Sequence, residues 1–207
     1  MVPAAALAPP PLVEALAAPG YGVDRGFAEP RLVGALVGDL ERRDRAGEFR
    51  AAAVGAGPNR AVRPQVRGDR ICWLAAPACD AEREILARLE ALRVALNRTL
   101  MLGLVDLECH YAIYAPGTRY ARHLDRSPAG AERVVSVVLY LNDGWRAADG
   151  GELVIAAGTG EVRVTPAAGT LAAFLSQRFE HEVRVARRAR LSLTGWFRRR
   201  PASGIAL

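Results

Sequence analysis

The sequence contains no lysine, so arginine supplies all 28 of its basic residues. Against 22 acidic residues this gives a formal net charge of +6. A basic balance permits nonspecific attraction to nucleic acid, but charge alone does not indicate a binding function. Ala, Pro and Gly are abundant as well, so we interpret the arginine excess as a bias of composition. We therefore do not expect a nucleic-acid partner.

Cysteine is also scarce. Cys72, Cys79 and Cys109 lack the density and the paired spacing of a disulfide framework or a zinc site. We therefore expect a reducing compartment, for which the cytoplasm is the simplest location.

Long uninterrupted hydrophobic runs are absent too. The apolar N-terminal segment, residues 1–20, has no basic start, is broken by prolines and contains Glu14, so it does not fit a signal peptide. No other stretch has the length and apolar character of a membrane span, and we expect no membrane partner. The length of 207 residues and the hydrophobic fraction of 51% fit one globular domain with a sizeable core.

Two segments in the first half have the periodicity of helices. Residues 30–44 begin with a proline, which suits the first turn of a helix. Residues 79–100 have Asp80 as the expected N-cap and acidic residues in the first turn. The apolar positions of the two helices are Leu32, Leu36, Leu40, Ile85, Leu89, Leu92 and Leu96. Residues 53–69 are rich in Gly, Pro and Arg and predict a loop.

After residue 101 the pattern changes to short strands separated by turn residues. The predicted strands cover residues 104–114, 133–142, 151–157, 161–165, 169–176, 181–186 and 190–197. Strands with no helix between them indicate an all-β barrel or sandwich, and the earlier helices can cover one of its sheets. The expected organisation is a single domain, residues 1–207, in which residues 1–100 support a β core at 101–200.

Histidine occurs three times. His123 and Asp125 are two residues apart, so in an extended segment their side chains point to the same side. An imidazole and a carboxylate so placed are two ligands of the facial triad that suits non-haem Fe(II). Taken alone the tripeptide is more typical of a solvated turn, and a triad needs a third ligand. His181 can supply it, whereas His110 has no ligand partner at a useful spacing and we interpret it as structural.

Arg190 follows His181 by nine residues. Fe(II) held by two histidines and one carboxylate needs an electron-donating cosubstrate to activate dioxygen. A dicarboxylate such as 2-oxoglutarate would need a cation at its far end. Arginine suits that role because its planar fork can bond both carboxylate oxygens at once.

This combination of residues resembles the Fe(II)/2-oxoglutarate-dependent dioxygenase superfamily. Within it, the sequence is similar to the prolyl hydroxylases of the oxygen-sensing type and their bacterial relatives. The matching segments are VRGDRICWL at 66–74, YAPGTRYARHLD at 114–125, VLYLNDGW at 138–145, DGGELVI at 149–155, FEHEV at 179–183 and RLSLTGWF at 190–197. The resemblance implies a mainly β fold with supporting helices, a double-stranded β-helix or cupin-like jelly roll, with the two predicted helices packed outside.

The resemblance also implies roles for individual residues. His123, Asp125 and His181 would be the iron ligands, and Arg190 would bind the distal carboxylate of 2-oxoglutarate. The other residues implied to surround the cosubstrate are Tyr140 and Thr194 as hydroxyl partners, Tyr114 near the metal, and Leu153, Val183 and Trp196 as apolar walls. Those implied to contact the substrate are Arg67, Asp69 and Trp73, on a loop that folds over a polypeptide, and Arg133 at the mouth.

Several of these residues have a structural alternative. Tyr140 and Trp196 lie in apolar strands and fit core aromatics. Leu153 and Val183 would be buried whether or not a cosubstrate touches them. Arg67 and Arg133 fit solvated surface charges equally well. The stretch from Tyr114 to His123 is one residue shorter than in the animal oxygen-sensing enzymes.

The function implied by the resemblance is hydroxylation of a prolyl residue in a protein substrate. The cosubstrates would be 2-oxoglutarate and O2, with Fe(II) as the metal, ascorbate as an auxiliary, and succinate and CO2 as released products. A 2-oxoglutarate oxygenase acting on a free amino acid or another metabolite is the alternative, followed by a nucleic-acid demethylase. From another class, a catalytically inactive jelly-roll binding module also remains open, because one fold serves many functions.

Overall fold

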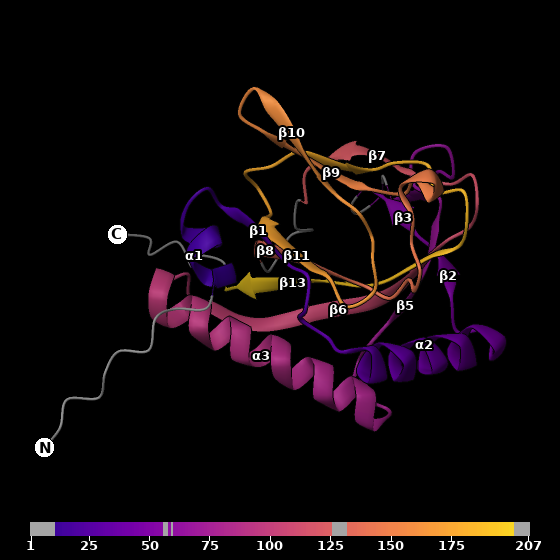
Figure 1. Ribbon diagram of the computed structural model, residues 1–207, viewed down its shortest axis with the longest axis horizontal. Helices are drawn as coiled ribbons and strands as arrows, with labels where there is room; N and C mark the ends of the chain where they lie inside the picture. Colours follow the sequence, from indigo (N-terminus) through magenta and orange to yellow (C-terminus); the bar gives the residue numbers. More distant parts are fainter. Residues whose placement is uncertain (1–10, 56–57, 59, 126–131, 201–207) are drawn as a thin grey trace, which may run out of the picture.

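Two facing antiparallel sheets form the β core (Figure 1). The computed structural model describes residues 11–55, 58, 60–125 and 132–200. The larger sheet contains, in spatial order, β1 (Tyr21–Asp24), β11 (Leu171–Leu175), β8 (Glu132–Tyr140), β13 (Arg190–Arg199), β6 (Leu104–Tyr114), β5 (Asp69–Trp73) and β2 (Arg50–Ala51). The smaller sheet contains β10 (Gly160–Val164), β9 (Leu153–Ala157), β12 (His181–Val183) and β7 (Tyr120–His123). The short strands β3 (Ala53–Val54) and β4 (Ala61–Val62) pair with each other.

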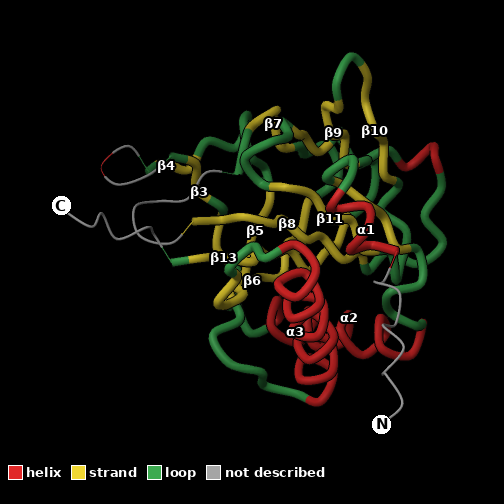
Figure 2. The backbone as a smooth tube through the Cα atoms, turned by 90° about the vertical axis from the view of Figure 1, so that its left-hand side faces the viewer, coloured by secondary structure: helices red, strands yellow, loops and turns green. Residues whose placement is uncertain are grey.

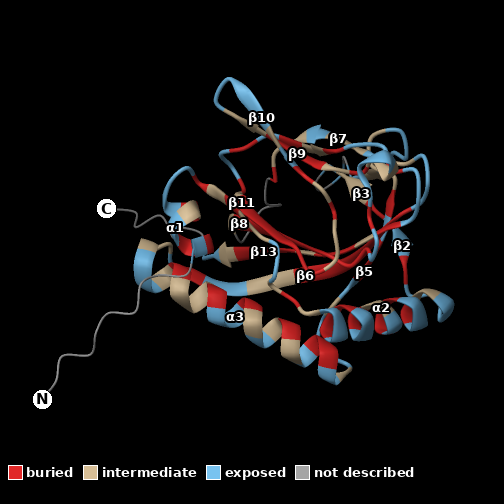
Figure 3. Ribbon diagram, in the orientation of Figure 1, coloured by how far each residue is buried: buried red, intermediate tan, exposed pale blue. Residues whose placement is uncertain are grey.

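The helices cover the outer face of the larger sheet (Figures 1 and 2). They are α2 (Pro30–Arg45) and α3 (Asp80–Leu100), while the short α1 (Pro11–Ala17) lies beside β1. Their buried faces turn toward the sheet and their exposed faces toward solvent (Figure 3). Each leucine or isoleucine buried there contributes about 1.5–3 kcal/mol relative to an exposed one. The predicted apolar positions are all buried: Leu32, Leu36, Leu40, Ile85, Leu89, Leu92 and Leu96.

Strand β13 shows how one segment serves both the core and the interior of the barrel. Its side chains alternate between the two faces of the sheet. Leu193 and Phe197 join the core under the helices. Arg190, Thr194 and Trp196 point to the other side and line a cavity between the two sheets. The same alternation on β6 and β8 makes the larger sheet the floor of that cavity.

The structure confirms the predicted mainly β core with helices outside, and corrects several details. The N-cap of α3 is Cys79, not Asp80, which is the first helical residue. The predicted loop at residues 53–69 contains β3 and β4, which pair with each other, and it ends on the first residue of β5, which pairs with β6. The predictions also lacked α1, β1, β2 and β7, which are too short for a periodic pattern, and the 3-10 helix η2 (Ala147–Asp149). Among the described residues, no helix combines the length and apolar character needed to span a bilayer.

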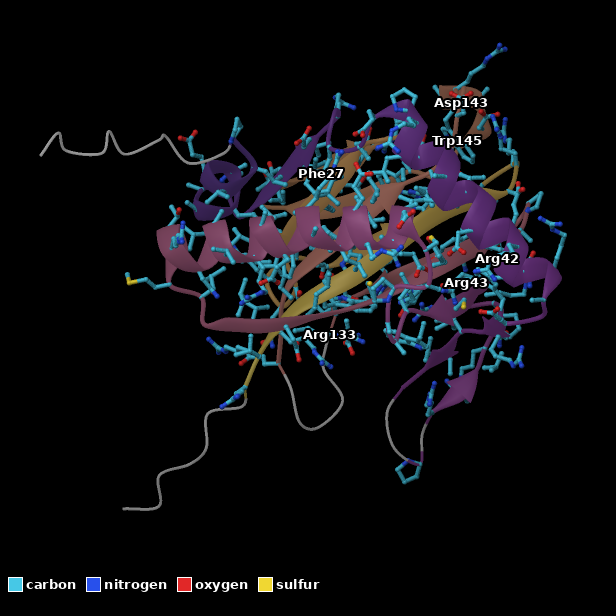
Figure 4. The ribbon with its side chains drawn as sticks, turned by 90° about the horizontal axis from the view of Figure 1, so that it is seen from below. Phe27, Arg42, Arg43, Arg133, Asp143 and Trp145 are labelled. Carbon is cyan, nitrogen blue, oxygen red and sulfur yellow. The ribbon has the colours of Figure 1, made fainter. Side chains whose placement is uncertain are left out.

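A buried ion-pair network fastens α2 to α3. Arg43, on the C-terminal half of α2 (Figure 4), is 9% exposed and donates to three carboxylates. Its nitrogens lie 3.0 Å from Asp39, 2.9 Å from Glu48 and 2.8 Å from Glu82. Glu82 on α3 is fully buried, and Asp39 nearly so. One guanidinium therefore neutralises carboxylates that burial would otherwise penalise.

Replacing Arg43 by Ala should strongly destabilise the protein, because it leaves the Glu82 carboxylate buried without its cation and Asp39 with only the exposed Arg42. Loss of one partner of a buried ion pair costs about 3–5 kcal/mol. The matched control is Arg42→Ala, since Arg42 is the exposed neighbour that also pairs with Asp39. In that variant Asp39 keeps its buried partner Arg43, so we expect a loss of about 1 kcal/mol or less. Urea unfolding of both variants measures the difference, and equal small losses would contradict the role assigned to Arg43.

Candidate active site

Pairing of β7 with β12 brings two histidines together. His123 is the last residue of β7 and His181 the first of β12, and the two are direct cross-strand partners. Their ring centroids lie 4.2 Å apart. Asp125 follows two residues after His123, beyond the end of the strand, and each of its carboxylate oxygens lies near one of the two rings.

The three side chains converge on one point. Nε2 of His123 lies 3.5 Å from one oxygen of Asp125, and Nε2 of His181 lies 3.5 Å from the other. One ligand atom from each residue falls within 4.8 Å of the others. Two imidazoles and one carboxylate so placed have the donor set of a facial triad.

The outer nitrogens of the two rings are held by backbone carbonyls. Nδ1 of His123 lies 2.8 Å from the carbonyl oxygen of Ala121, and Nδ1 of His181 lies 3.2 Å from that of Phe179. A carbonyl only accepts, so Nδ1 carries the proton of each neutral ring. The lone pair then resides on Nε2, where a metal ligand needs it.

Asp125 is kept as a carboxylate although it is buried. Burial opposes its ionisation, but the influence of the neighbouring His123 and His181 outweighs burial, so the pKa of Asp125 lies below its usual range. The Ser136 hydroxyl donates to Asp125 at 2.7 Å and lies 2.9 Å from the Ser176 hydroxyl. Burial lowers the pKa of His181 to about 4, which leaves that ring neutral near pH 7. The residues thus fit a divalent cation.

A buried arginine lies in the same cavity. Arg190 is 1% exposed and pairs with Tyr114 across the β13–β6 register. Its guanidinium carbon lies 5.1 Å from the ring centre of Tyr114 and 5.0 Å from that of Tyr140. Its Nε donates to the carbonyl of Gly151 at 2.8 Å. Among the described residues no carboxylate forms an ion pair with it, which is unusual because burying an uncompensated cation is costly.

Tyr140 and Gly151 shape the surroundings of Arg190. The Tyr140 hydroxyl is buried and has no hydrogen-bond partner within the described part of the chain. Burial raises the pKa of Tyr140 to about 12, so the hydroxyl keeps its proton and can donate. Gly151 has φ of +70°, and a Cβ there would lie 3.2 Å from Cδ of Arg190. A side chain at Gly151 would therefore press on the arginine.

The cavity that contains the triad and Arg190 has a volume of about 480 Å³ including its open mouth. It brings together most of the residues that the sequence singled out. Those lining it are His123, Asp125, His181, Arg190, Tyr114, Thr194, Leu153, Val183, Trp196, Arg67 and Asp69. Tyr140 lies directly beside Arg190, and Trp73 and Arg133 lie outside the lining.

The residues predicted on a substrate loop are more ordered than expected. Asp69 and Trp73 are the ends of β5, where they pair with β6. Arg67 precedes that strand and forms a two-pronged ion pair with Asp69 at 2.8 and 2.9 Å. Its guanidinium also lies 4.8 Å from the ring of Tyr120, which stacks on His123 at 3.7 Å. Continuous packing therefore connects this segment to the triad.

Outside the cavity lining, Arg133 lies against Trp196. Its guanidinium carbon is 3.6 Å from the indole centre, and its Nε lies 2.7 Å from Glu108. Figure 4 shows Arg133 on the side of the molecule away from α2. The solvated surface charge that the sequence also allowed is therefore wrong for Arg133 and for the half-buried Arg67.

Sequence reasoning missed several lining residues. They are His110, Ala112, Tyr120, Val138 and Phe174. Alternation along β6 places His110 and Ala112 on the same face as Tyr114, and this signal was available in the sequence. The contacts of Phe174 were not, because its ring lies 4.6 Å from His181 only through the pairing of distant strands.

A second group of three potential metal ligands comes from α2 and from the start of α3. Asp39, Cys79 and Glu82 have ligand atoms within 4.8 Å of one another. The Arg43 guanidinium already pairs with both carboxylates. Its positive charge makes this group a poor cation site compared with the triad.

Comparisons with known proteins agree with this geometry. A model of the 2OG-Fe(II) oxygenase superfamily matches residues 109–198, which include the triad and Arg190. No curated protein matches the chain at a significant level.

Solved structures extend the likeness to nearly the whole chain. A crystal structure of a Pseudomonas putida prolyl-4-hydroxylase is 44% identical, with 92% of this chain and 98% of that chain covered and a TM-score of 0.84. A Trichoplax adhaerens prolyl hydroxylase, solved with a hypoxia inducible factor oxygen degradation domain peptide fragment, is 25% identical, with 90% and 86% covered and a TM-score of 0.80. The epimerase SnoN from nogalamycin biosynthesis shares the fold. It is 16% identical, with 94% of this chain and 86% of that chain covered and a TM-score of 0.67.

Proposed function

The chain belongs to the 2OG-Fe(II) oxygenase superfamily, and from that premise we propose that it hydroxylates a prolyl residue in a protein or peptide. The predicted double-stranded β-helix is confirmed by this membership. The enzymes of the superfamily use Fe(II), 2-oxoglutarate and O2, and the reaction releases succinate and CO2. Ascorbate is an auxiliary in the assay.

The observation that carries the proposal is the buried, unpaired cation in the cavity of the triad. Arg190 is 1% exposed and has no carboxylate partner among the described residues. An anion bound beside it would compensate its charge and receive a two-pronged hydrogen bond. Tyr140 offers a further donor at the same end. A dicarboxylate whose other end reaches the triad satisfies both groups of residues, which is the role we propose for 2-oxoglutarate.

Each residue of the triad has a task in this reaction. His123 and His181 would hold Fe(II) through Nε2, and Asp125 would supply one negative charge and fix the third position. Iron bound there supplies the oxidising chemistry that couples decarboxylation of 2-oxoglutarate to hydroxylation of a C–H bond. Ser136 orients the Asp125 carboxylate. The buried walls Leu153 and Val183 exclude water from the reacting groups.

A protein or peptide substrate fits the mouth better than a free metabolite. Trp73 is 45% exposed at the edge of the larger sheet, and an exposed indole is a common anchor for a polypeptide. The Trichoplax relative was solved with a peptide. A metabolite oxygenase remains the alternative, because SnoN shows that the fold alone does not select the substrate.

Incubation with a host lysate tests the function. The pure protein, Fe(II), ascorbate and 2-oxoglutarate should yield peptides that gain one oxygen on a prolyl residue, with an equivalent release of succinate. Asp125→Ala is the control that we expect to be inactive. Its unfolding temperature should match that of the wild-type protein, which checks that the fold is intact. Faster oxidation of free proline or of an alkylated oligonucleotide than of any lysate protein would favour the alternatives.

Replacing Arg190 by Lys should weaken the binding of 2-oxoglutarate, because the positive charge remains but the planar fork of the guanidinium is lost. Loss of one charge-assisted hydrogen bond costs about 1.5–3 kcal/mol, which raises the Michaelis constant for 2-oxoglutarate by about 10- to 150-fold. The matched control is Arg188→Lys, two residues away on the exposed surface, which should leave that constant unchanged. Normal 2-oxoglutarate kinetics in Arg190→Lys would show that another residue holds the distal carboxylate.

A further inference from the structure

A short segment that the proposed reaction does not use lies directly behind Arg190. It covers residues 145–151 and runs from Trp145 through η2 to Gly150 and Gly151. Arg190 lines the cavity, whereas Trp145, Gly150 and Gly151 are not among the lining residues. We call these three residues the end wall, because they contact each other and Arg190 on the side away from the cavity.

The end wall is fastened to the chain that leads into β13. The amide of Gly151 donates to the carbonyl of Val185 at 3.0 Å, and Gly150 forms an antiparallel bridge with Ala186. Gly150 has φ of +65°, and a Cβ there would lie 2.5 Å from the carbonyl oxygen of Val185, which is closer than a side chain can approach. The two glycines therefore let this backbone pack tightly against the residues that precede Arg190.

The indole of Trp145 holds the end wall against the arginine. Trp145 is 9% exposed, and its Nε1 donates to the carbonyl of Gly150 at 2.9 Å. A Cβ built on Gly151 would lie 3.2 Å from Cζ2 of Trp145 and 3.2 Å from Cδ of Arg190. Gly151 therefore fits between the indole and the arginine with no space left for a side chain.

The end wall also decides which N–H groups Arg190 offers to the cavity. A guanidinium has one N–H on Nε and four on its two terminal nitrogens. The Nε of Arg190 donates to the carbonyl of Gly151 at 2.8 Å, which leaves the terminal nitrogens for a ligand. A fork oriented in this way suits two-pronged binding of a carboxylate. A displacement of Gly151 would therefore change the distance between this cation and the triad.

We propose that Trp145 is a positioning residue: through Gly150 and Gly151 it fixes the guanidinium of Arg190, and thereby the length of the dicarboxylate that the cavity binds. This inference rests on the proposed role of Arg190 toward the distal carboxylate of 2-oxoglutarate. A diacid with one more methylene would have to push Arg190 back against the end wall, which has no space to receive it. The end wall therefore favours 2-oxoglutarate over longer diacids.

Calorimetry on the full chain loaded with Zn(II), which supports no turnover, tests this proposal. The two probes are 2-oxoglutarate and 2-oxoadipate, which is longer by one methylene. The measured quantity is the ratio of their dissociation constants. The wild-type protein should bind 2-oxoadipate more weakly by about tenfold or more, and tenfold corresponds to about 1.4 kcal/mol.

Replacing Trp145 by Phe removes the Nε1–H donor and one ring, so Gly150 and Gly151 can move away from the cavity and Arg190 can follow them. The preference for 2-oxoglutarate should fall by about fivefold, which corresponds to one ordinary hydrogen bond of about 1 kcal/mol. Replacing Gly151 by Ala adds a Cβ against Cδ of Arg190 and pushes the arginine toward the cavity. That variant should bind both diacids more weakly, and 2-oxoadipate should lose more affinity than 2-oxoglutarate.

Phe49→Leu is the matched control, because Phe49 is a buried aromatic of the core under the helices and does not line the cavity. It should lower the unfolding temperature and leave the ratio of the two dissociation constants unchanged. If Trp145→Phe does not fold, NMR of the wild-type protein tests the same contact without any ligand. The Nε proton of Arg190, identified by its loss in Arg190→Lys, should exchange slowly with solvent, and rapid exchange would show that Gly151 does not hold the guanidinium.

Two calorimetric results would overturn the inference. One is an equal weakening of both diacids in Trp145→Phe, which would show that the indole is only structural. The other is a wild-type protein that binds the two diacids equally well. Arg190→Lys separates the inference from the proposed function. Undiminished 2-oxoglutarate binding in Arg190→Lys would contradict the proposed role of Arg190 itself, whereas weaker binding there with an unchanged ratio in Trp145→Phe would contradict the inference alone.

Discussion

The contact of the buried Asp125 carboxylate with two imidazoles is the interaction on which the site depends. It exists because β7 and β12 pair with His123 directly opposite His181. A shift of one residue in this register would turn one ring to the outside of the barrel. Backbone carbonyls then fix both rings with their Nε2 atoms inward, and Ser136, from the opposite sheet, fixes the carboxylate. The smaller sheet and the segment after β7 therefore supply the triad, and the larger sheet helps to hold it in place.

The larger sheet supplies the positive charge of the site, which is carried by Arg190 on β13. Alternation along β13 sends Arg190 into the cavity and Leu193 into the core beneath the helices, so the packing of α2 and α3 against the outer face sets the position of the cation on the inner face. Arg43 supports that packing by neutralising the carboxylates between the helices. The molecule thus has an anionic triad on one sheet and a buried cation on the other, with room between them for an anionic ligand.

The sequence predicted the parts that depend on local pattern. The leucine stripe of residues 30–44 and the long strand that begins at Arg190 are periodic, and His123, Asp125 and Arg190 could be singled out from spacing and resemblance. What the sequence did not predict depends on pairing between distant strands. Residues 69–73 show no strand pattern of their own, and only pairing with β6 makes β5 a strand. The contacts of His110 with Trp73 and Trp196 are of the same kind, because the two indoles come from two other strands.

Anaerobic calorimetric titration with Fe(II) tests most directly whether the triad is a metal site. We expect one ion per chain in the wild-type protein. We expect binding at least about tenfold weaker in Asp125→Asn, which keeps the shape of the side chain but loses the charge that a hard cation prefers. Binding of one ion with undiminished affinity in Asp125→Asn would contradict the assignment, because the iron would then be held by other residues.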